Sequence, residues 1–388
     1  MANDLVEAPA KTPLQRASLP WRVSSSMIMG LTSMLSRGFL YGLNNVEVTG
    51  LQRFLKILDE RQDVDQRKRG LMTVCNHVSV IDDPVMWGIL PARYSFNPSN
   101  LRWGLGAHDI CFKNKALSTF FSLGQVLPTH RQLYSQHGGP FQSTIPQAIR
   151  LLSSQPFTGL QPGTLALASE TPDVADPFTT GDLTYTTTGT DSIPSPSVYA
   201  QNRFAWVHVF PEGCIHQHPS LSMRYFKWGM SRLILESEPM PDVMPMFIDG
   251  TQHMMSEERT FPRFLPRGGK TLRVAFGELL DTEKAFGDLR ARWQELVRKE
   301  TSRKKVAGEE KQVVLAMGEL TDELKYGREA VELRIEVAKR VRDEIEKLRI
   351  SLGYPEDDPK LGLAETWAKE PPTKAYRSNV DDSLVRKE

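Results

Sequence analysis

Short apolar runs that alternate with helical stretches constrain the fold of this chain more than any other feature of its sequence. The runs are rich in β-branched and aromatic residues and end at polar or turn-forming residues, as strands do. They cover residues 46–48, 71–75, 125–128, 204–210, 243–248 and 272–276. Helical patterns lie between them, at residues 51–60, around 115–122 and from 226 onward. Strands that alternate with helices predict an α/β fold, with a mixed sheet flanked by helices.

Changes in composition divide the chain into segments. Residues 1–23 are polar and are expected to form a flexible arm, and residues 24–280 hold the α/β body. Within this body, residues 151–202 contain no Lys, Arg or His but many Thr, Ser, Pro and Gly, which predicts a disordered or surface-loop insertion. Residues 281–352 read as a charged helical extension, and residues 353–388, rich in Pro and charge, as a disordered tail.

The helical extension carries an apolar seam with a 4-3-3-4-3 spacing. The seam consists of Val331, Ile335, Ala338, Val341, Ile345 and Leu348. It could dock on the α/β body or pair with a protein partner or a second copy. Docking is favoured, because the seam is barely two heptads long.

The overall composition excludes several classes of protein. The 48 Lys and Arg balance 47 Asp and Glu, so no electrostatic pull toward nucleic acid is expected. Three cysteines without a C-x-x-C pair exclude a disulfide framework and a zinc knuckle. His208, His216 and His218 with Cys214 lack a completing carboxylate at a known spacing, so no metal site is predicted. Glycine strings near residues 104 and 268 do not complete a nucleotide-binding motif, and no cofactor is expected.

Two segments could bring the chain to a membrane surface. A mean hydropathy of −0.37 and the lack of a long uncharged apolar run argue against a spanning helix. Residues 24–43 are apolar but broken by Ser, Thr, Gly and Arg37, which fits an interfacial helix or an amphipathic helix packed on the protein's own core. The same two readings apply to a second segment, whose expected membrane anchors are Phe226, Trp228, Met230, Leu233, Ile234 and Leu235.

The segment with the clearest chemistry follows the strand candidate 71–75. It reads CNHVSVIDDPVMWG and stands at a strand's carboxyl end, where open α/β sheets place their sites. His77 and Asp82 are five residues apart, about 140° around an ideal helix, so they can pair only if His77 lies before the helix and Asp82 in its first turns. A carboxylate at one imidazole nitrogen would leave the other free to take a proton from a hydroxyl. A plain loop or cap network is the alternative.

This segment resembles the first motif of the glycerolipid acyltransferase superfamily, N-H-x-S-x-x-D, present here at residues 76–82. The continuation D-P-x-x-W-G at residues 83–88 is similar to the tafazzin branch in particular. Further family motifs follow in order: G-Q-V-L-P-T-H-R ending at Arg131, F-P-E-G at residues 210–213, F-K-W-G at 226–229 and an apolar strand with an embedded proline at 243–247. The resemblance covers roughly residues 45–280 apart from the insertion.

The resemblance implies a glycerol-3-phosphate acyltransferase-like fold and gives roles to the motif residues. His77 would be the general base and Asp82 its orienter. The residues expected to contact substrate are Asn76, Ser79, Arg131, Phe210, Pro211, Glu212 and Gly213. Arg131 would bind a phosphate or else form a surface salt bridge. Glu212 would bond a glycerol hydroxyl or hold Arg131, and Gly213 would let the backbone approach a ligand. In tafazzins the region after F-P-E-G is associated with membrane attachment.

The activity implied is direct acyl transfer from a phospholipid such as phosphatidylcholine to a lysophospholipid such as monolysocardiolipin, without coenzyme A and without an acyl-enzyme. This is cardiolipin remodelling, and the implied location is mitochondrial, peripheral or monotopic on membranes that face the intermembrane space. The residues alone do not separate it from acyl-CoA-dependent transfer to a lysophospholipid. A non-catalytic lipid-binding scaffold on the membrane surface is an alternative from another class.

Overall fold

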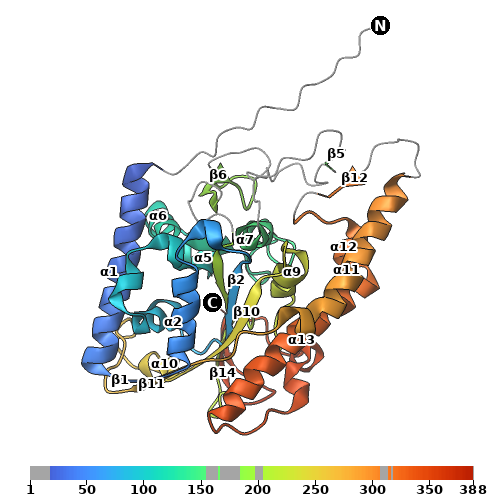
Figure 1. Ribbon diagram of the computed structural model, residues 1–388. Coiled ribbons are helices and arrows are strands. Elements are labelled where there is room, and N and C mark those ends of the chain that lie inside the picture. Colours follow the sequence, from blue (N-terminus) through green and yellow to red (C-terminus); the bar gives the residue numbers. More distant parts are fainter. Residues whose placement is uncertain are drawn as a thin grey trace.

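The computed structural model describes residues 18–153, 165–166, 184–196, 204–305, 313–315 and 318–387. Its centre is a seven-stranded mixed sheet (Figure 1). The strand order is β1 (Asn45–Thr49), β11 (Thr271–Phe276), β10 (Asp242–Asp249), β2 (Leu71–Cys75), β8 (Trp206–Val209), β3 (Arg102–Ala107) and β4 (Val126–Thr129). Every neighbouring pair is parallel except β10 and β11. The α/β fold predicted from the sequence is confirmed, and all six strand candidates lie in this sheet.

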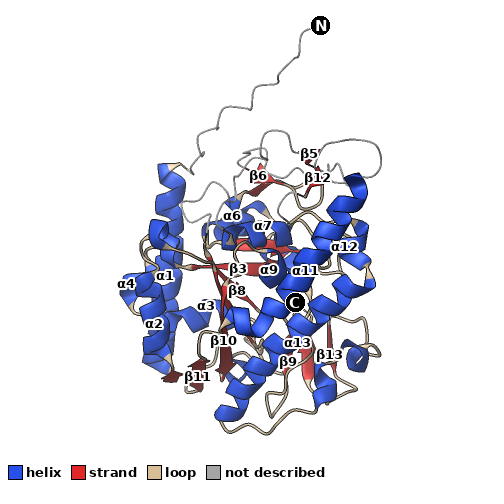
Figure 2. Cartoon of the chain, turned by 45° about the vertical axis from the view of Figure 1, so that its right-hand side comes forward, coloured by secondary structure: helices blue, strands red, loops and turns tan. Residues whose placement is uncertain are grey.

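Helices surround the sheet, and Figures 1 and 2 show α2 and α13 on opposite sides of it. The helices are α1 (Leu19–Leu43), α2 (Leu51–Glu60), α3 (Asp82–Met86), α4 (Ala92–Ser95), α5 (His108–Cys111), α6 (Lys115–Leu123), α7 (Thr144–Leu152), α9 (Gly229–Glu236), α10 (Thr251–Met254), α11 (Thr282–Lys305), α12 (Asp322–Tyr326) and α13 (Arg328–Ser351). Strand β2 lies at the centre, and all five of its residues are buried, as expected for a parallel strand covered on both faces.

The seam of the helical extension docks on the body, as the sequence favoured. On α13, Ala338, Val341 and Ile345 are buried in the same hydrophobic core as the sheet. Ile335, however, is 50% exposed, because the buried stripe runs instead through Leu333 and Val337. The extension therefore shares one core with the acyltransferase-like body.

Helix α1 fits both readings of residues 24–43, on two different faces. On the inner face, Ser25 Oγ donates to the carbonyl of Leu123 at 2.6 Å, and Met29 and Leu40 are buried. On the outer face, large apolar side chains are exposed at every fourth position. The helix begins at Leu19, so the prediction of a flexible arm is wrong for residues 19–23, and residues 1–17 lie outside the described part of the chain.

The second membrane segment is a core helix, and the prediction of a membrane anchor there is wrong. Helix α9 packs against α7 and α13, and this leaves no apolar face for a bilayer. Trp228 is half-buried, and the other expected anchors are buried in the hydrophobic core: Phe226, Met230, Leu233, Ile234 and Leu235. Even Arg232 is 1% exposed, paired with Glu236 at 2.7 Å. None of the described helices is long and apolar enough to cross a membrane.

The predicted insertion is ordered where the structure describes it. Residues 184–196 form a hairpin of β6 (Thr184–Tyr185) and β7 (Ile193–Pro194), so of the two predictions, a disordered segment or a surface loop, disorder is wrong for them. Tyr185 and Ile193 are buried in a small cluster with Phe112 and Val126. A further short pair joins β5 (Leu165–Ala166) to β12 (Val313–Val314). Residues 154–164, 167–183 and 197–203 lie outside the described part of the chain.

The tail is ordered too, and the prediction of disorder after residue 353 is wrong. It forms two 3₁₀ turns, Pro359–Gly362 and Ala364–Trp367, and then a hairpin of β13 (Ala375–Arg377) and β14 (Leu384–Arg386). Strand β14 pairs with β9 (Ile215–Gln217), which follows the F-P-E-G motif. The hairpin gains its order from a partner strand about 170 residues earlier in the chain, with Val385 opposite His216.

Candidate active site

His77 and Asp82 form the pair that the sequence predicted. His77 lies in the loop after β2, and Asp82 is the first residue of α3. His77 Nδ1 lies 2.8 Å from Asp82 Oδ2. The Asp82 side chain is fully buried, while that of His77 is 19% exposed, so the imidazole can be reached from outside the pair.

Four donors converge on the Asp82 carboxylate. Oδ2 accepts the backbone N–H groups of Val78 and Ser79 at 2.7 and 2.9 Å in addition to His77. Oδ1 accepts the hydroxyl of Thr251 at 2.5 Å. Because an ionised carboxylate only accepts, His77 Nδ1 carries the proton of this contact and Nε2 is left as the basic nitrogen. The described residues place no hydrogen-bond partner at Nε2.

Phe210 fixes the plane of the imidazole from the neighbouring strand. Strand β8 runs parallel to β2, so the residues after both strands meet at one edge of the sheet. The Phe210 ring stacks on His77 with the ring centroids 4.4 Å apart and the planes 22° apart. One face of His77 is therefore covered by an apolar ring.

Glu212 supports the His77 loop and does not hold Arg131, which corrects one of its two expected roles, and its bond to a glycerol hydroxyl stays a prediction. It is 2% exposed. Its two carboxylate oxygens accept the backbone N–H groups of His77 at 2.9 Å and Arg224 at 3.0 Å. It makes no contact with Arg131 in the described residues. Glu212 thus holds the loop that carries His77 in place.

Asn76 and Ser79 are also buried, and their contact with substrate stays a prediction. The Asn76 side chain exchanges two hydrogen bonds with the backbone of Ile248 on β10, at 2.9 and 2.8 Å. The Ser79 side chain is fully buried, and its hydroxyl has no hydrogen-bond partner among the described residues. Asn76 ties the loop to the neighbouring strand.

Gly213 is required by the backbone and by a neighbouring side chain. Its φ is +61°, a region that favours glycine. A Cβ at this position would lie 3.0 Å from the Lys227 side chain, so Lys227 makes one close approach here, and the approach of a ligand stays a prediction. The Lys227 N–H also donates to the carbonyl of buried Pro211 at 2.8 Å, which joins the F-P-E-G and F-K-W-G motifs.

Arg131 forms the salt bridge that was the alternative to phosphate binding. Its Nε lies 3.0 Å from Asp109 Oδ1, and a second contact joins Nη2 to Oδ2. Nη1 donates to the carbonyl of Lys387 in the tail, and the guanidinium covers the ring of Tyr134 at 4.4 Å. These contacts use both edges of the fork. No contact in the described residues joins Arg131 to His77.

Asp83, next to the catalytic candidate, has a different environment. It accepts Trp87 Nε1 at 3.0 Å and forms a two-point ion pair with Arg102, whose Nε lies 2.7 Å from Oδ1. Burial alone would raise the pKa of Asp83, but the Arg102 guanidinium and the other donors leave it lowered. The D-P-x-x-W spacing is therefore a helical i, i+4 contact that holds α3.

Several site residues were not recognised in the sequence. Thr251 carries a usable signal, because it begins α10 two residues after the end of β10. His208 lies behind Phe210, with its Nδ1 2.8 Å from the Thr73 hydroxyl. Burial lowers the pKa of His208 to about 3, so it stays neutral. His216 bonds Asp381 of the tail at 2.8 Å. Among the described residues, His208, His216, His218 and Cys214 form no metal cluster.

The geometry can be compared with known proteins. The family model described as "Acyltransferase" matches residues 45–249, which include both His77 and Asp82. Tafazzin of Saccharomyces cerevisiae is 34% identical over 396 aligned residues, covering 99% of this chain and 91% of the yeast protein. The chain belongs to the tafazzin family of acyltransferases.

Tafazzin of Drosophila melanogaster is 28% identical, over 72% of this chain and 57% of the fly protein. A protein named N-acylphosphatidylethanolamine synthase from Arabidopsis thaliana is 29% identical, over 54% of this chain and 56% of its own length. Because the chain is a member of the tafazzin family and carries the acyltransferase domain, it is an acyltransferase of phospholipid metabolism, as its motifs predicted.

Proposed function

We propose that this enzyme moves a fatty acyl chain from a donor phospholipid to a lysophospholipid such as monolysocardiolipin, without coenzyme A. His77 Nε2 takes the proton of a free hydroxyl on the lysophospholipid, and the oxygen attacks the ester carbonyl of the donor. When the tetrahedral intermediate collapses, His77 returns the proton to the departing glycerol oxygen. The observation that carries the proposal is the 2.8 Å contact from His77 Nδ1 to buried Asp82, with His77 itself reachable.

Asp82 acts while His77 holds the extra proton. Its carboxylate faces Nδ1 and stabilises the imidazolium, and it keeps Nε2 as the basic nitrogen before the reaction. The N–H groups of His77, Val78 and Ser79 already donate to Glu212 and Asp82. The developing oxyanion therefore needs donors other than these three.

The substrates favour a reaction at the membrane surface, because moving each CH₂ of a lipid into water costs about 0.8 kcal/mol. The outer face of α1 suits such a surface. Five large apolar side chains, each at least 47% exposed, repeat there at i, i+4 spacing: Leu19, Val23, Met27, Leu31 and Leu35. The only charged residues of α1 are Arg22 and Arg37, which is compatible with anionic lipids. A mitochondrial location, on membranes that face the intermembrane space, is part of this proposal and rests on the resemblance of the motifs to the tafazzin branch.

The test separates acyl transfer between phospholipids from acyl-CoA-dependent transfer. The purified chain is mixed with vesicles that contain phosphatidylcholine with a labelled acyl group and monolysocardiolipin, after exhaustive removal of coenzyme A. Labelled cardiolipin is the expected product. Formation of cardiolipin only after acyl-CoA is supplied would overturn the donor assignment.

His77→Ala tests the base in the same assay. It should lower the rate about 10²–10⁴-fold, the usual contribution of general acid–base catalysis, while vesicle binding stays unchanged. His253→Ala, which removes an exposed histidine from α10, is the matched control and should keep the wild-type rate. An unchanged rate in His77→Ala would exclude His77 as the base and favour a lipid-binding scaffold whose apparent activity comes from elsewhere.

A further inference from the structure

Two histidines stand side by side at the carboxyl edge of the sheet, away from the His77 loop. In the parallel pair β3 and β4, Ala107 lies opposite Thr129. His108 and His130 are the residues that directly follow β3 and β4, so the register of the two strands brings them together. Their rings stack with the centroids 4.2 Å apart and the planes 23° apart.

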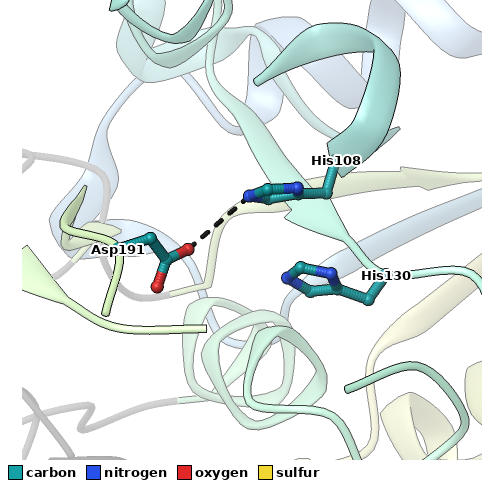
Figure 3. Close-up of side chains that lie close together, drawn as sticks. All are labelled: His108, His130 and Asp191. Carbon is teal, nitrogen blue, oxygen red and sulfur yellow. Dashed lines mark ion pairs between the residues drawn. The ribbon is translucent and has the colours of Figure 1, made fainter. Parts of the chain in front are cut away.

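A carboxylate from the inserted hairpin completes the cluster. Asp191 lies between β6 and β7, and Figure 3 shows it facing a nitrogen of each imidazole. His108 Nε2 is 3.6 Å from Asp191 Oδ2, and one ligand atom from each of the three residues lies within 4.8 Å of the other two. Three segments that are distant in the sequence therefore bring two nitrogens and one oxygen to one point.

This donor set is suited to a zinc ion. Zinc binds imidazole nitrogen and carboxylate oxygen at about 2.0–2.2 Å, which sets neighbouring ligand atoms about 3.3–3.5 Å apart in a tetrahedron. The His108–Asp191 distance is already close to this value. The remaining atoms need to approach by about 1 Å, within the reach of small side-chain rotations.

The surroundings of Asp191 also favour a cation. No Lys or Arg lies within ion-pair distance of it in the described part of the chain, although its side chain is only 19% exposed. Its oxygens are held by the backbone N–H groups of Thr187 and Thr188 and by the hydroxyls of Thr186 and Thr187. Outer hydrogen bonds of this kind orient carboxylate ligands in metal sites. The Thr187 hydroxyl also bonds His130 Nε2 at 2.7 Å, and the ion would replace that contact.

We propose that His108, His130 and Asp191 bind one zinc ion, with a water molecule as the fourth ligand. The site goes beyond acyl transfer, since it fastens the inserted hairpin to β3 and β4. The hairpin needs such a fastening: its strands have two residues each, and its buried apolar contacts form only a small cluster. On binding, the Nε2 proton of His130 moves to Nδ1 through solvent, and no covalent change follows.

The full-length chain is treated with EDTA, dialysed and titrated with Co²⁺, whose visible absorption reports tetrahedral coordination, and then with Zn²⁺. We expect one Co²⁺ per chain, displaced by Zn²⁺, and a higher melting temperature with either ion. Absence of a saturable site at one equivalent in the wild-type protein would overturn the proposal before any variant is made.

Variants then locate the ion. Asp191→Asn keeps a side-chain acceptor for the threonine donors but loses the charge, and His108→Ala removes a half-buried ligand; each should weaken Co²⁺ binding more than tenfold. His253→Ala should bind Co²⁺ as the wild type does. If both ligand variants, shown by circular dichroism to be folded, bind Co²⁺ with wild-type affinity and spectrum, the ion lies elsewhere and the proposed site is refuted.

Discussion

Asp82→Asn separates the charge of Asp82 from its hydrogen bonds. If the asparagine oxygen takes the position of Oδ2, it still accepts from His77 Nδ1 and from the N–H groups of Val78 and Ser79. The amide NH₂ then points at Thr251, whose hydroxyl can accept as well as donate. All four contacts survive, so the free energy of unfolding should change by no more than about 1 kcal/mol.

Asp82→Asn should lower the rate of the chemical step far more than it lowers the stability of the fold. At the observed 2.8 Å, the attraction between the carboxylate and the imidazolium is about 6 kcal/mol for an effective dielectric constant of about 20. In Asp82→Asn the dipole of the amide retains part of this attraction to the imidazolium. We therefore expect a loss of about 3–5 kcal/mol in transition-state stabilisation, a rate lower by about 10²–10⁴.

The effect on the reaction is measured by the initial rate of acyl transfer between vesicle lipids. The effect on stability is measured by unfolding the same samples in urea. Asp83→Asn is the control at the next position, and its expected result is the reverse. It strips Arg102, 11% exposed, of its partner and should cost about 3 kcal/mol of stability with little direct effect on the reaction. A folded Asp82→Asn enzyme with a rate within threefold of wild type would refute the assignment of Asp82 as the orienter.

Three further changes test other parts of the structure. Leu35→Glu, on the outer face of α1, should weaken binding to vesicles, measured by co-sedimentation, about tenfold or more. The control Ile335→Glu changes an apolar residue that is 50% exposed on α13 and should not weaken binding. Equal losses of binding in the two variants would contradict a membrane face on α1. Arg349→Met should lower the free energy of unfolding in urea by about 3 kcal/mol, because it leaves the buried carbonyl of Leu221 and the partly buried carbonyl of Ser220 without their donor; an unchanged midpoint would contradict this. Burial alone would raise the pKa of Asp381, but its contact with His216 holds that pKa well below its usual range. Asp381→Asn should therefore be less stable than wild type above about pH 4, and this difference in stability should shrink as the pH falls below that. A difference in stability that does not depend on pH would argue against the ion pair.

The elements that the sequence predicted well are those whose signal is local. Strand β2 is a continuous apolar run and has the predicted bounds, as does α2. Strand β3 was not among the six predicted strands, and Gly104 and Gly106 interrupt its apolar pattern. His77 and Asp82 are five residues apart, so their pairing could be inferred from local spacing, whereas their roles as base and orienter came from the resemblance to the acyltransferase motif.

The failures depend on contacts that the sequence does not display. The segment 226–236, which contains α9, mixes apolar residues with Lys227 and Arg232. Interfacial and core helices share this pattern, and only the packing of α9 against α7 and α13 decides between the two. The tail is rich in charge, yet its hairpin is held by β9, far away in the chain. Glu212 was expected to hold Arg131, one of its two predicted roles, whereas its observed partner, the N–H of His77, lies 135 residues away.

The buried contacts of the extension lead back to the base. On α13, Arg342 donates to the carbonyls of Met223 and Arg224 at 2.7 and 3.1 Å. The N–H of Arg224 donates to Glu212, and Glu212 accepts the N–H of His77. Each link removes a polar group from water and leaves a buried orphan if it breaks, at about 1–3 kcal/mol each. The helical extension is therefore part of the scaffold that fixes the His77 loop, and a change that loosens α13 should affect the reaction through Glu212.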